Sequence, residues 1–262
     1  MFKSIRANHE RRSYLPRIDS SLESSLINFF YPLIPKSDID LVFIHVGKCG
    51  GGSVWSTMIS DQMVLGKYNK IKKAHTAKPI YKKDTNYLII IRNPVCRLVS
   101  CFNWRKFLLI ERGTNKIFDF QKLQPEINVL NKYGNIDNLA IKLYNNNTID
   151  PNVWEDLMKI NHVGKGIDFY LNPFLDKIDN KQIVGVLSQH SISNDYEKLF
   201  GSKVLRNIHS SKQMSAHISD EGRKNLAKAF YFEFDAIKKL NSIFPIGEEK
   251  LARLLKWQST EV

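Results

Sequence analysis

Long apolar runs, cysteine clusters and internal repeats are all missing from this chain of 262 residues. Without an apolar run of about 20 residues, the sequence has no candidate transmembrane helix. Its three cysteines, Cys49, Cys96 and Cys101, have neither the spacing of a zinc site nor the density of a disulfide framework, so we expect reduced thiols. The first residues have no apolar signal core. These absences favour a cytoplasmic, bacterial-type protein, and a Golgi-lumenal domain separated from its anchor stays open as the alternative.

Acidic residues are also scarce, with 26 Asp and Glu against 39 Lys and Arg, which gives a formal net charge of +13. A positive field of this size attracts anions and raises their local concentration. Nucleic acid, acidic glycan, a membrane surface and a nucleotide cofactor all fit, and charge alone does not choose among them. The hydrophobic share of 43% is ordinary for a globular protein and excludes a mainly disordered chain.

Three apolar runs read as buried strands, at residues 41–46, 87–91 and 183–187. The first two lead directly into helical patterns, and strands that alternate with helices imply a mostly parallel sheet. We therefore predict an α/β fold: a P-loop-like, three-layer arrangement with a central, mostly parallel sheet flanked by helices. A single domain is expected over residues 1–262, in which the polar, Asn-containing segment 108–180 forms a mainly helical insertion.

The first candidate site is the glycine-rich turn between the first strand and its helix. Glycine lets the backbone approach a ligand closely, and the first-turn N–H groups of a helix favour an anion. Lys48 adds a positive charge and Ser53 a hydroxyl donor. In the usual nucleoside-triphosphate loop the lysine follows the glycines and a Ser or Thr holds magnesium. Here Lys48 precedes the glycines, so the turn suits a phosphate without that metal ligand; a plain turn with an exposed lysine is the alternative.

The second candidate site lies where the strand at 87–91 meets a helix that starts with proline. Arg92 sits at this junction, and its planar guanidinium suits bidentate phosphate binding. Ser100 lies about two turns along the helix, on the face that also carries Arg97 and Trp104. Two anion sites on neighbouring strand ends fit a ligand with two separated phosphates. The alternative is a salt-bridged arginine and a helix-surface serine.

Together these segments resemble the PAPS-dependent sulfotransferases, where PAPS is 3′-phosphoadenosine-5′-phosphosulfate, and most closely the heparan and chondroitin 2-O-type carbohydrate sulfotransferases. Their first signature is similar to Phe-Ile-His-x-Pro-Lys-Thr-Gly-Gly-Thr-Ser, and residues 43–53 read Phe-Ile-His-Val-Gly-Lys-Cys-Gly-Gly-Gly-Ser. Their second is similar to Arg-Asp-Pro-Val-x-Arg-x-x-Ser, and residues 92–100 read Arg-Asn-Pro-Val-Cys-Arg-Leu-Val-Ser. Residues 41–107 carry most of the resemblance.

Four positions depart from these signatures. Gly47 stands in place of proline, Cys49 and Gly52 in place of threonines, and Asn93 in place of aspartate. The loss of two hydroxyl donors leaves more of the binding to backbone N–H groups.

The resemblance implies a role for each matched residue. The first loop would hold the 5′-phosphosulfate, with Lys48 on the leaving phosphate, while Arg92 and Ser100 would bind the 3′-phosphate. A late polar loop would close over the nucleotide. The residues implied in binding PAPS, or its product adenosine 3′,5′-bisphosphate (PAP), are Lys48, Cys49, Gly50, Gly51, Gly52, Ser53, Val54, Arg92, Ser100, Ser210, Ser211 and Lys212. No metal is expected.

The acceptor hydroxyl needs a base, and a neutral histidine suits that task. We predict His75, which lies between the two signatures as a histidine does in the 2-O-sulfating enzymes. A surface histidine is the alternative for His75, and His190, His209 and Glu111 are reserve bases. His45 is expected to be a packed residue of the first strand.

We therefore expect a sulfotransferase that acts on an acceptor hydroxyl by in-line displacement. The resemblance favours a carbohydrate acceptor, with residues 108–180 forming its pocket, and a small natural-product hydroxyl is the alternative. A P-loop kinase and a basic nucleic-acid-binding protein are the rivals from other classes; we expect no nucleic-acid partner, because an anionic cofactor explains the charge. The sequence leaves the oligomeric state open.

Overall fold

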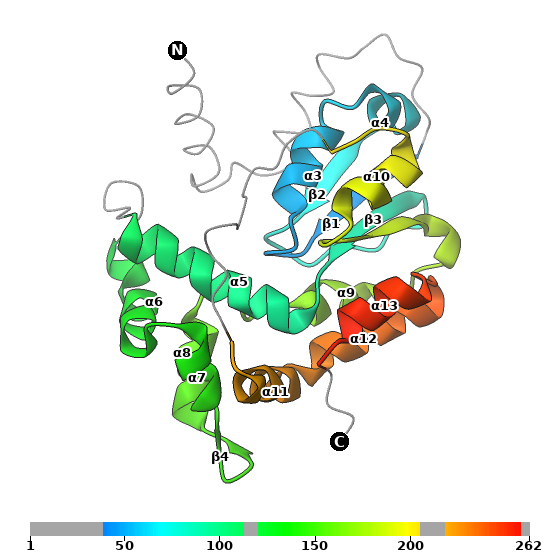
Figure 1. Ribbon diagram of the computed structural model, residues 1–262. Helices are drawn as coiled ribbons and strands as arrows, with labels where there is room; N and C mark the ends of the chain where they lie inside the picture. The colour runs from blue at the N-terminus through cyan, green and yellow to red at the C-terminus, as the bar shows by residue number, and fades with distance from the viewer. Residues whose placement is uncertain (1–38, 113–119, 205–217, 258–262) are drawn as a thin grey trace.

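A four-stranded sheet forms the centre of the computed structural model, which describes residues 39–112, 120–204 and 218–257 (Figure 1). All neighbouring strands pair in parallel, in the order β2-β1-β3-β6. Their bounds are Asp40–His45 (β1), Ile71–Ala74 (β2), Thr85–Ile91 (β3) and Ile183–Ser188 (β6). The predicted α/β fold with a mostly parallel central sheet is confirmed.

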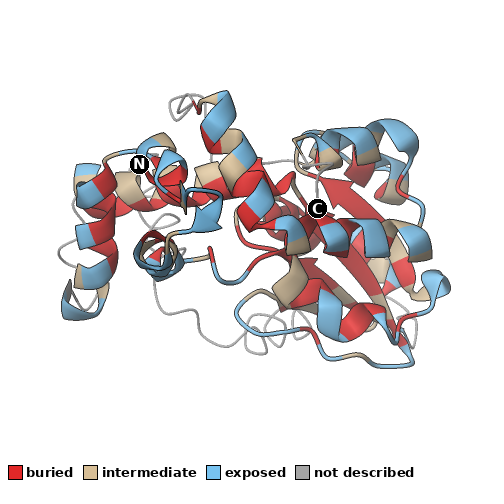
Figure 2. Ribbon diagram, turned by 90° about the horizontal axis from the view of Figure 1, so that it is seen from below, coloured by how far each residue is buried: buried red, intermediate tan, exposed pale blue. Residues whose placement is uncertain are grey.

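The middle strands are apolar because both of their faces are covered. Residues 87–91 of β3 are fully buried, and Figure 2 shows the strands buried almost throughout. The sequence did not predict β2, which lies at the edge and contains two lysines. Lys72 pairs with Asp40 of β1, and the Nζ atom of Lys73 lies 4.5 Å from the centre of the Trp55 ring. These contacts stabilise the two lysines in a sheet strand.

Helices cover both faces of the sheet, and their apolar sides join the strands in one core (Figure 1). On one face lie α3 (Gly51–Met58), α4 (Gln62–Lys67) and α10 (Ile192–Phe200). On the other lie α9 (Ile167–Leu175), α12 (Tyr231–Ile243) and α13 (Glu248–Leu255). A short 3-10 helix, η2 (Asn180–Gln182), leads into β6.

A second apolar cluster lies beside the sheet and is formed mainly by helices. Its helices are α5 (Pro94–Lys106), α6 (Phe120–Tyr133), α7 (Ile136–Ile141), α8 (Pro151–Lys159) and α11 (Asp220–Ala229). α5 runs on into a π-helix, η1 (Phe107–Glu111), and β4 (Tyr144–Asn145) pairs with β5 (Thr148–Ile149). Residues 108–180 supply α6, α7 and α8 to this helical lobe and α9 to the sheet core.

The strand order places one junction at the edge where ligands bind in open α/β sheets. From β1 the chain moves to β2 on one side, then crosses to β3 on the other, so the order reverses between β1 and β3. Ligands of such sheets bind outside the carboxyl ends of the strands at this reversal. The segments that begin there are residues 46–50 after β1 and residues 92–93 after β3.

No helix within the described residues has both the length and the apolar character that crossing a membrane requires.

Candidate functional site

The loop after β1 turns sharply and presents the start of α3 without a side-chain cap. Lys48 and Gly50 both have left-handed backbones, with φ of 67° and 86°. Gly50 is the N-cap of α3, and no side chain hydrogen-bonds to the first turn there. The early N–H groups of a helix have no intrahelical partner and favour an anion. The loop therefore retains the donors that a phosphate would use.

Close packing explains two of the glycines in this loop. A Cβ atom on Gly47 would lie 2.8 Å from Nδ1 of His162, and one on Gly51 would lie 2.1 Å from Cδ2 of His45. Any side chain at either position would displace a histidine ring. A Cβ atom on Gly52 would meet nothing within 4 Å, so that position faces open space. Proline, which the resembling signature has at this position, would therefore overlap the ring of His162.

Lys48 is half-buried and electrostatically perturbed. Burial lowers the pKa of its amine from 10.5 to about 8, and repulsion from Arg92 and Arg105 contributes. Its Nζ atom lies 4.4 Å from the centre of the Trp104 ring, a cation–π contact that favours the charged form. A lysine with a lowered pKa in a glycine-rich turn is a candidate functional residue, not merely a solvated surface charge.

Arg92 reaches the same loop from the end of β3. Its Nη1 atom donates a hydrogen bond to the carbonyl oxygen of Lys48 at 3.2 Å. Its buried Nε–H has no hydrogen-bond partner among the described residues. Ser100 is half-buried in α5, one turn before Trp104, the residue that covers Lys48. The structure therefore brings Lys48 and Arg92 together and places Ser100 on the helix that borders both.

His75 follows β2 and is held through its ring and its main chain. Its Nδ1 atom lies 2.9 Å from the carbonyl oxygen of His45, and the two rings stack with centroids 4.0 Å apart. Because a carbonyl oxygen only accepts, Nδ1 carries a hydrogen, and in the neutral ring Nε2 then holds the lone pair. The Tyr170 hydroxyl donates to the carbonyl of His75. This tautomer is the one that a histidine base with a reactive Nε2 requires.

His162 also belongs to this group, although nothing in the sequence singled it out. Its ring centroid lies 5.5 Å from that of His75, and its ring fills the space beside Gly47. Burial lowers its pKa to about 3, aided by repulsion from His75 and Lys48. Within the described part of the chain, no three His, Cys, Asp or Glu side chains are grouped as metal ligands.

The reserve bases lie elsewhere or outside the described residues. His190 is exposed after β6, with Nδ1 2.7 Å from the Ser188 hydroxyl oxygen. Glu111 is exposed at the end of η1. His209 falls outside the described residues, as does the expected closing loop Ser210, Ser211 and Lys212.

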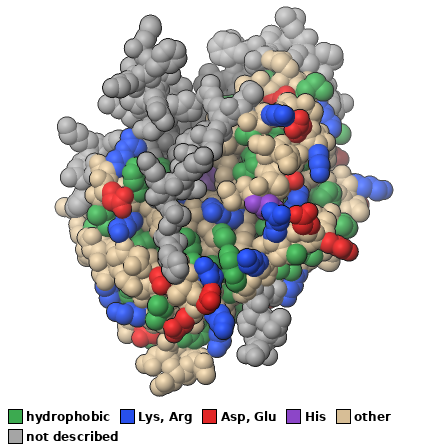
Figure 3. Space-filling view, in the orientation of Figure 1, with side chains coloured by type: hydrophobic (Ala, Val, Ile, Leu, Met, Phe, Trp, Pro, Cys, Tyr) green, Lys and Arg blue, Asp and Glu red, His purple; other side chains and the backbone are tan. Residues whose placement is uncertain are grey.

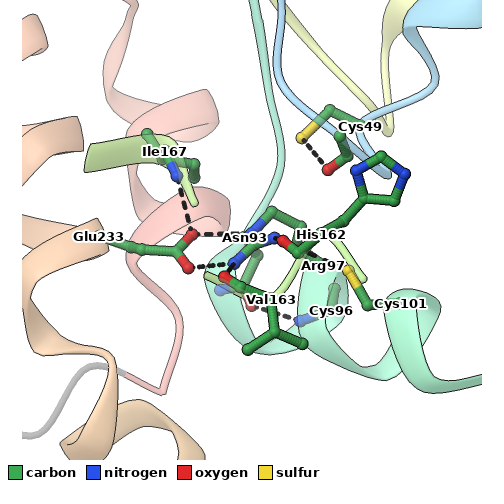
Figure 4. Close-up of polar contacts among 10 residues, drawn as sticks. Cys49, Asn93, Cys96, Arg97, Cys101, His162, Val163, Ile167 and Glu233 are labelled. Atoms are coloured by element: carbon green, nitrogen blue, oxygen red, sulfur yellow. Dashed lines mark hydrogen bonds and ion pairs between the residues drawn. The ribbon is translucent and has the colours of Figure 1, made fainter. Parts of the chain in front are cut away.

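The sequence placed Arg97 on the helix face opposite the apolar stripe, and the structure adds that this face is covered there. Arg97 is fully buried and forms an ion pair with Glu233 of α12 (Figure 4). Its Nη1 atom also donates to the carbonyl of His162 at 2.8 Å. Burial raises the pKa of the Glu233 carboxyl, and Arg97 opposes that rise. The second arginine of the signature therefore links α5 of the helical lobe to α12.

Asn93 uses both the donor and the acceptor of its side-chain amide. Its Nδ2 atom donates to the carbonyls of Leu254 and Lys256, at 3.0 and 2.8 Å, while its Oδ1 atom caps the N–H of Cys96. A carboxylate at this position could cap α5 but could not donate. The amide therefore fastens the end of α13 beside the start of α5.

Two predicted cofactor-binding residues can offer only their main chains. The side chains of Cys49 and Val54 are both 0% exposed and belong to the sheet core. Burial raises the pKa of the Cys49 thiol to about 12, so the thiol stays protonated.

No family model, curated protein or solved structure matches this chain, so the arrangement of its own side chains carries the assignment of function.

Proposed function

We propose that this chain is a sulfotransferase that moves a sulfuryl group from PAPS to an acceptor hydroxyl, most simply one on a carbohydrate. The observation that carries the proposal is the hydrogen bond from Arg92 to the carbonyl of Lys48 at the reversal of strand order. It joins the two signature segments in one place. A nucleotide with phosphates at both ends needs two cationic groups so arranged.

The donors around this junction fit such a nucleotide. The uncapped first turn of α3 and the Lys48 ammonium suit the 5′-phosphosulfate, and the partnerless Nε–H of Arg92 suits the 3′-phosphate. Figure 3 shows Lys and Arg side chains, with histidine beside them, gathered in the middle of one face. When bound, PAPS supplies the sulfuryl group and leaves as PAP.

The side chains of this chain can move the proton and stabilise the charge that the transfer requires. His75 accepts the hydroxyl proton at Nε2, while its Nδ1–H remains on the carbonyl of His45 and steadies the imidazolium. Lys48 hydrogen-bonds to the leaving phosphate oxygen. With a pKa of about 8, its amine is mostly charged at neutral pH. One proton passes from the acceptor to His75, and the phosphate leaves as an anion.

Nucleotide binding is the first test. PAP should raise the melting temperature without magnesium, whereas ATP with magnesium should raise it much less. Arg92→Ala should abolish most of the shift, while Arg253→Ala, which alters an exposed arginine paired with Glu249, should leave it unchanged. A larger shift with ATP and magnesium would favour a kinase instead.

Transfer is the second test. Labelled PAPS is incubated with a panel of glycans and small alcohols, which also separates the two acceptor classes. Lys48→Ala and His75→Ala should lower turnover by roughly 10²–10⁴-fold while PAP binding persists in His75→Ala. An active His75→Ala enzyme would remove His75 as the base.

A further inference from the structure

The segment that carries His162 is held in an unusual backbone conformation. His162 has a φ of 71°, in the left-handed region that a non-glycine residue rarely adopts. Such strain persists only where the surrounding structure over-determines it, and it clusters at functional sites.

Two buried ion pairs hold this segment. In the first pair, Nη2 of Arg105 lies 2.7 Å from Oε2 of Glu126. The other oxygen of Glu126 accepts a hydrogen bond from the N–H of Asn161 at 2.9 Å. In the second pair, Arg97 binds Glu233 and also donates a hydrogen bond to the carbonyl of His162, as Figure 4 shows. Buried pairs contribute little net stability because desolvation opposes the attraction, but they can fix one geometry. Here they fix the peptide groups on both sides of the His162 ring.

The ring points away from the Arg97–Glu233 pair and toward the turn that contains Cys49 (Figure 4). The atoms of His162 nearest to a Cβ position on Gly47 are Nδ1, Cγ and Cβ, so Nε2 lies on the side of the ring away from Gly47. The ring also lies 5.5 Å from the ring of His75, centroid to centroid. His162 therefore stands beside both the loop of Lys48 and the predicted base.

The charges around His162 decide what it can do. Arg97, Arg105 and Lys48 all disfavour a positive imidazole, and burial does so most strongly. The ring is therefore neutral at working pH and keeps its proton. It is too weakly basic to remove a hydroxyl proton, yet it offers one N–H as a hydrogen-bond donor.

We propose that His162 is a catalytic residue that donates a hydrogen bond from Nε2 to an oxygen of the sulfuryl group during transfer. This inference rests on the proposed function. In the transfer the acceptor oxygen bonds to sulfur, the bond from sulfur to the phosphate oxygen breaks, and the acceptor proton goes to His75. His162 keeps its proton throughout and stabilises charge on the group in transit, as donors in oxyanion holes do.

Two variants of similar shape separate hydrogen bonding from packing. In His162→Gln the amide can donate, whereas in His162→Met nothing can. Calorimetry without an acceptor should show PAPS affinity about 10-fold lower in the Met variant, because a hydrogen bond to a charged group is lost, and within about threefold of wild type in the Gln variant. PAP lacks the sulfuryl group, so its affinity should be unchanged in both.

Turnover supplies the second readout. Turnover should fall by about 10²–10³-fold in the Met variant and by much less in the Gln variant. His162→Asn tolerates the left-handed backbone, but its amide is too short to reach the sulfuryl group, so its turnover and PAPS affinity should resemble those of the Met variant. It replaces the Met variant if that protein does not fold. Gly201→Ala strains a left-handed backbone with open space around it, and should lower the melting temperature with no effect on PAPS affinity.

The outcomes separate the inference from the proposed function. If wild type binds neither PAPS nor PAP, the proposed function fails and this inference fails with it. If wild type binds both, equal PAPS affinity in the Gln and Met variants overturns the role of His162 alone.

Discussion

Replacing Lys48 with methionine should stabilise the protein at neutral pH. The fall in the pKa of Lys48 from 10.5 to about 8 means that folding disfavours its charged form. Since one pKa unit corresponds to 1.36 kcal/mol, the penalty is about 3 kcal/mol. The cation–π contact with Trp104 favours the charge by about 0.5–2 kcal/mol. The net penalty is then about 2 kcal/mol, which methionine removes while it retains contact with the ring.

The sign of the pH dependence follows from proton binding. Below pH 8 Lys48 is charged in both states, and the folded state carries the full penalty. Between pH 8 and 10.5 the folded state releases the proton before the unfolded state does, so the penalty fades as pH rises. The advantage of Lys48→Met in the free energy of unfolding should therefore shrink from about 2 kcal/mol at pH 7 to under about 1 kcal/mol at pH 10.

Urea unfolding of both proteins from pH 7 to 10 measures this difference, and other groups that titrate in this range cancel in the comparison. Lys177→Met, which replaces an exposed lysine, should show no pH-dependent difference. An equally flat difference for Lys48→Met would mean that the Lys48 amine is solvated, and the argument for its chemical role would lose its electrostatic support.

Two further predictions concern the residues that depart from, or conform to, the sulfotransferase signatures. Gly51→Ala should lower the free energy of unfolding by about 1–3 kcal/mol because its Cβ would overlap the His45 ring. Gly52→Ala should raise the free energy of unfolding by about 0.5 kcal/mol, because alanine has the higher helix propensity and the position faces open space. Equal urea midpoints for the two variants would contradict the close packing at Gly51. Asn93→Asp should lower the free energy of unfolding by about 2 kcal/mol or more, since a carboxylate would face two carbonyls that the amide now binds, and an unchanged melting temperature would refute this.

The parts of the fold that the sequence predicted are those with a local signal. The strands at 41–46, 87–91 and 183–187 appear within one or two residues of their expected bounds, because continuous apolar runs report burial on both faces. Ser219, a residue type that favours helix N-caps, does cap α11, since its hydroxyl accepts from the N–H of Gly222. Local chemistry decides both kinds of feature.

The parts that were missed depend on distant partners. In β2, Lys72 pairs with Asp40 and Lys73 contacts Trp55, and these contacts stabilise the strand. No pattern within the four residues of β2 predicts these distant partners. Apolar residues recur at helical spacing from Leu226 to Leu240, but the chain bends at Phe230 and forms α11 and α12. No glycine or proline marks that bend.

The candidate site divides in the same way. Glycines, Lys48 and Arg92 could be found because motif spacing and strand ends place them together. The sequence assigned a phosphate to Arg92 and no role to Arg97; in the structure Arg92 reaches the loop, whereas Arg97 is buried in an ion pair. The partners of Arg97, which are Glu233 of α12 and the carbonyl of His162, are distant in sequence and could not be read from the motif.

The contact between Gly47 and His162 couples two positions that are far apart in the chain. A side chain at residue 47 would clash with the His162 ring, and a small residue at 162 would leave a hole beside Gly47. The tolerance of either position to substitution therefore depends on the residue at the other, and a mutational scan confined to the loop would miss this constraint.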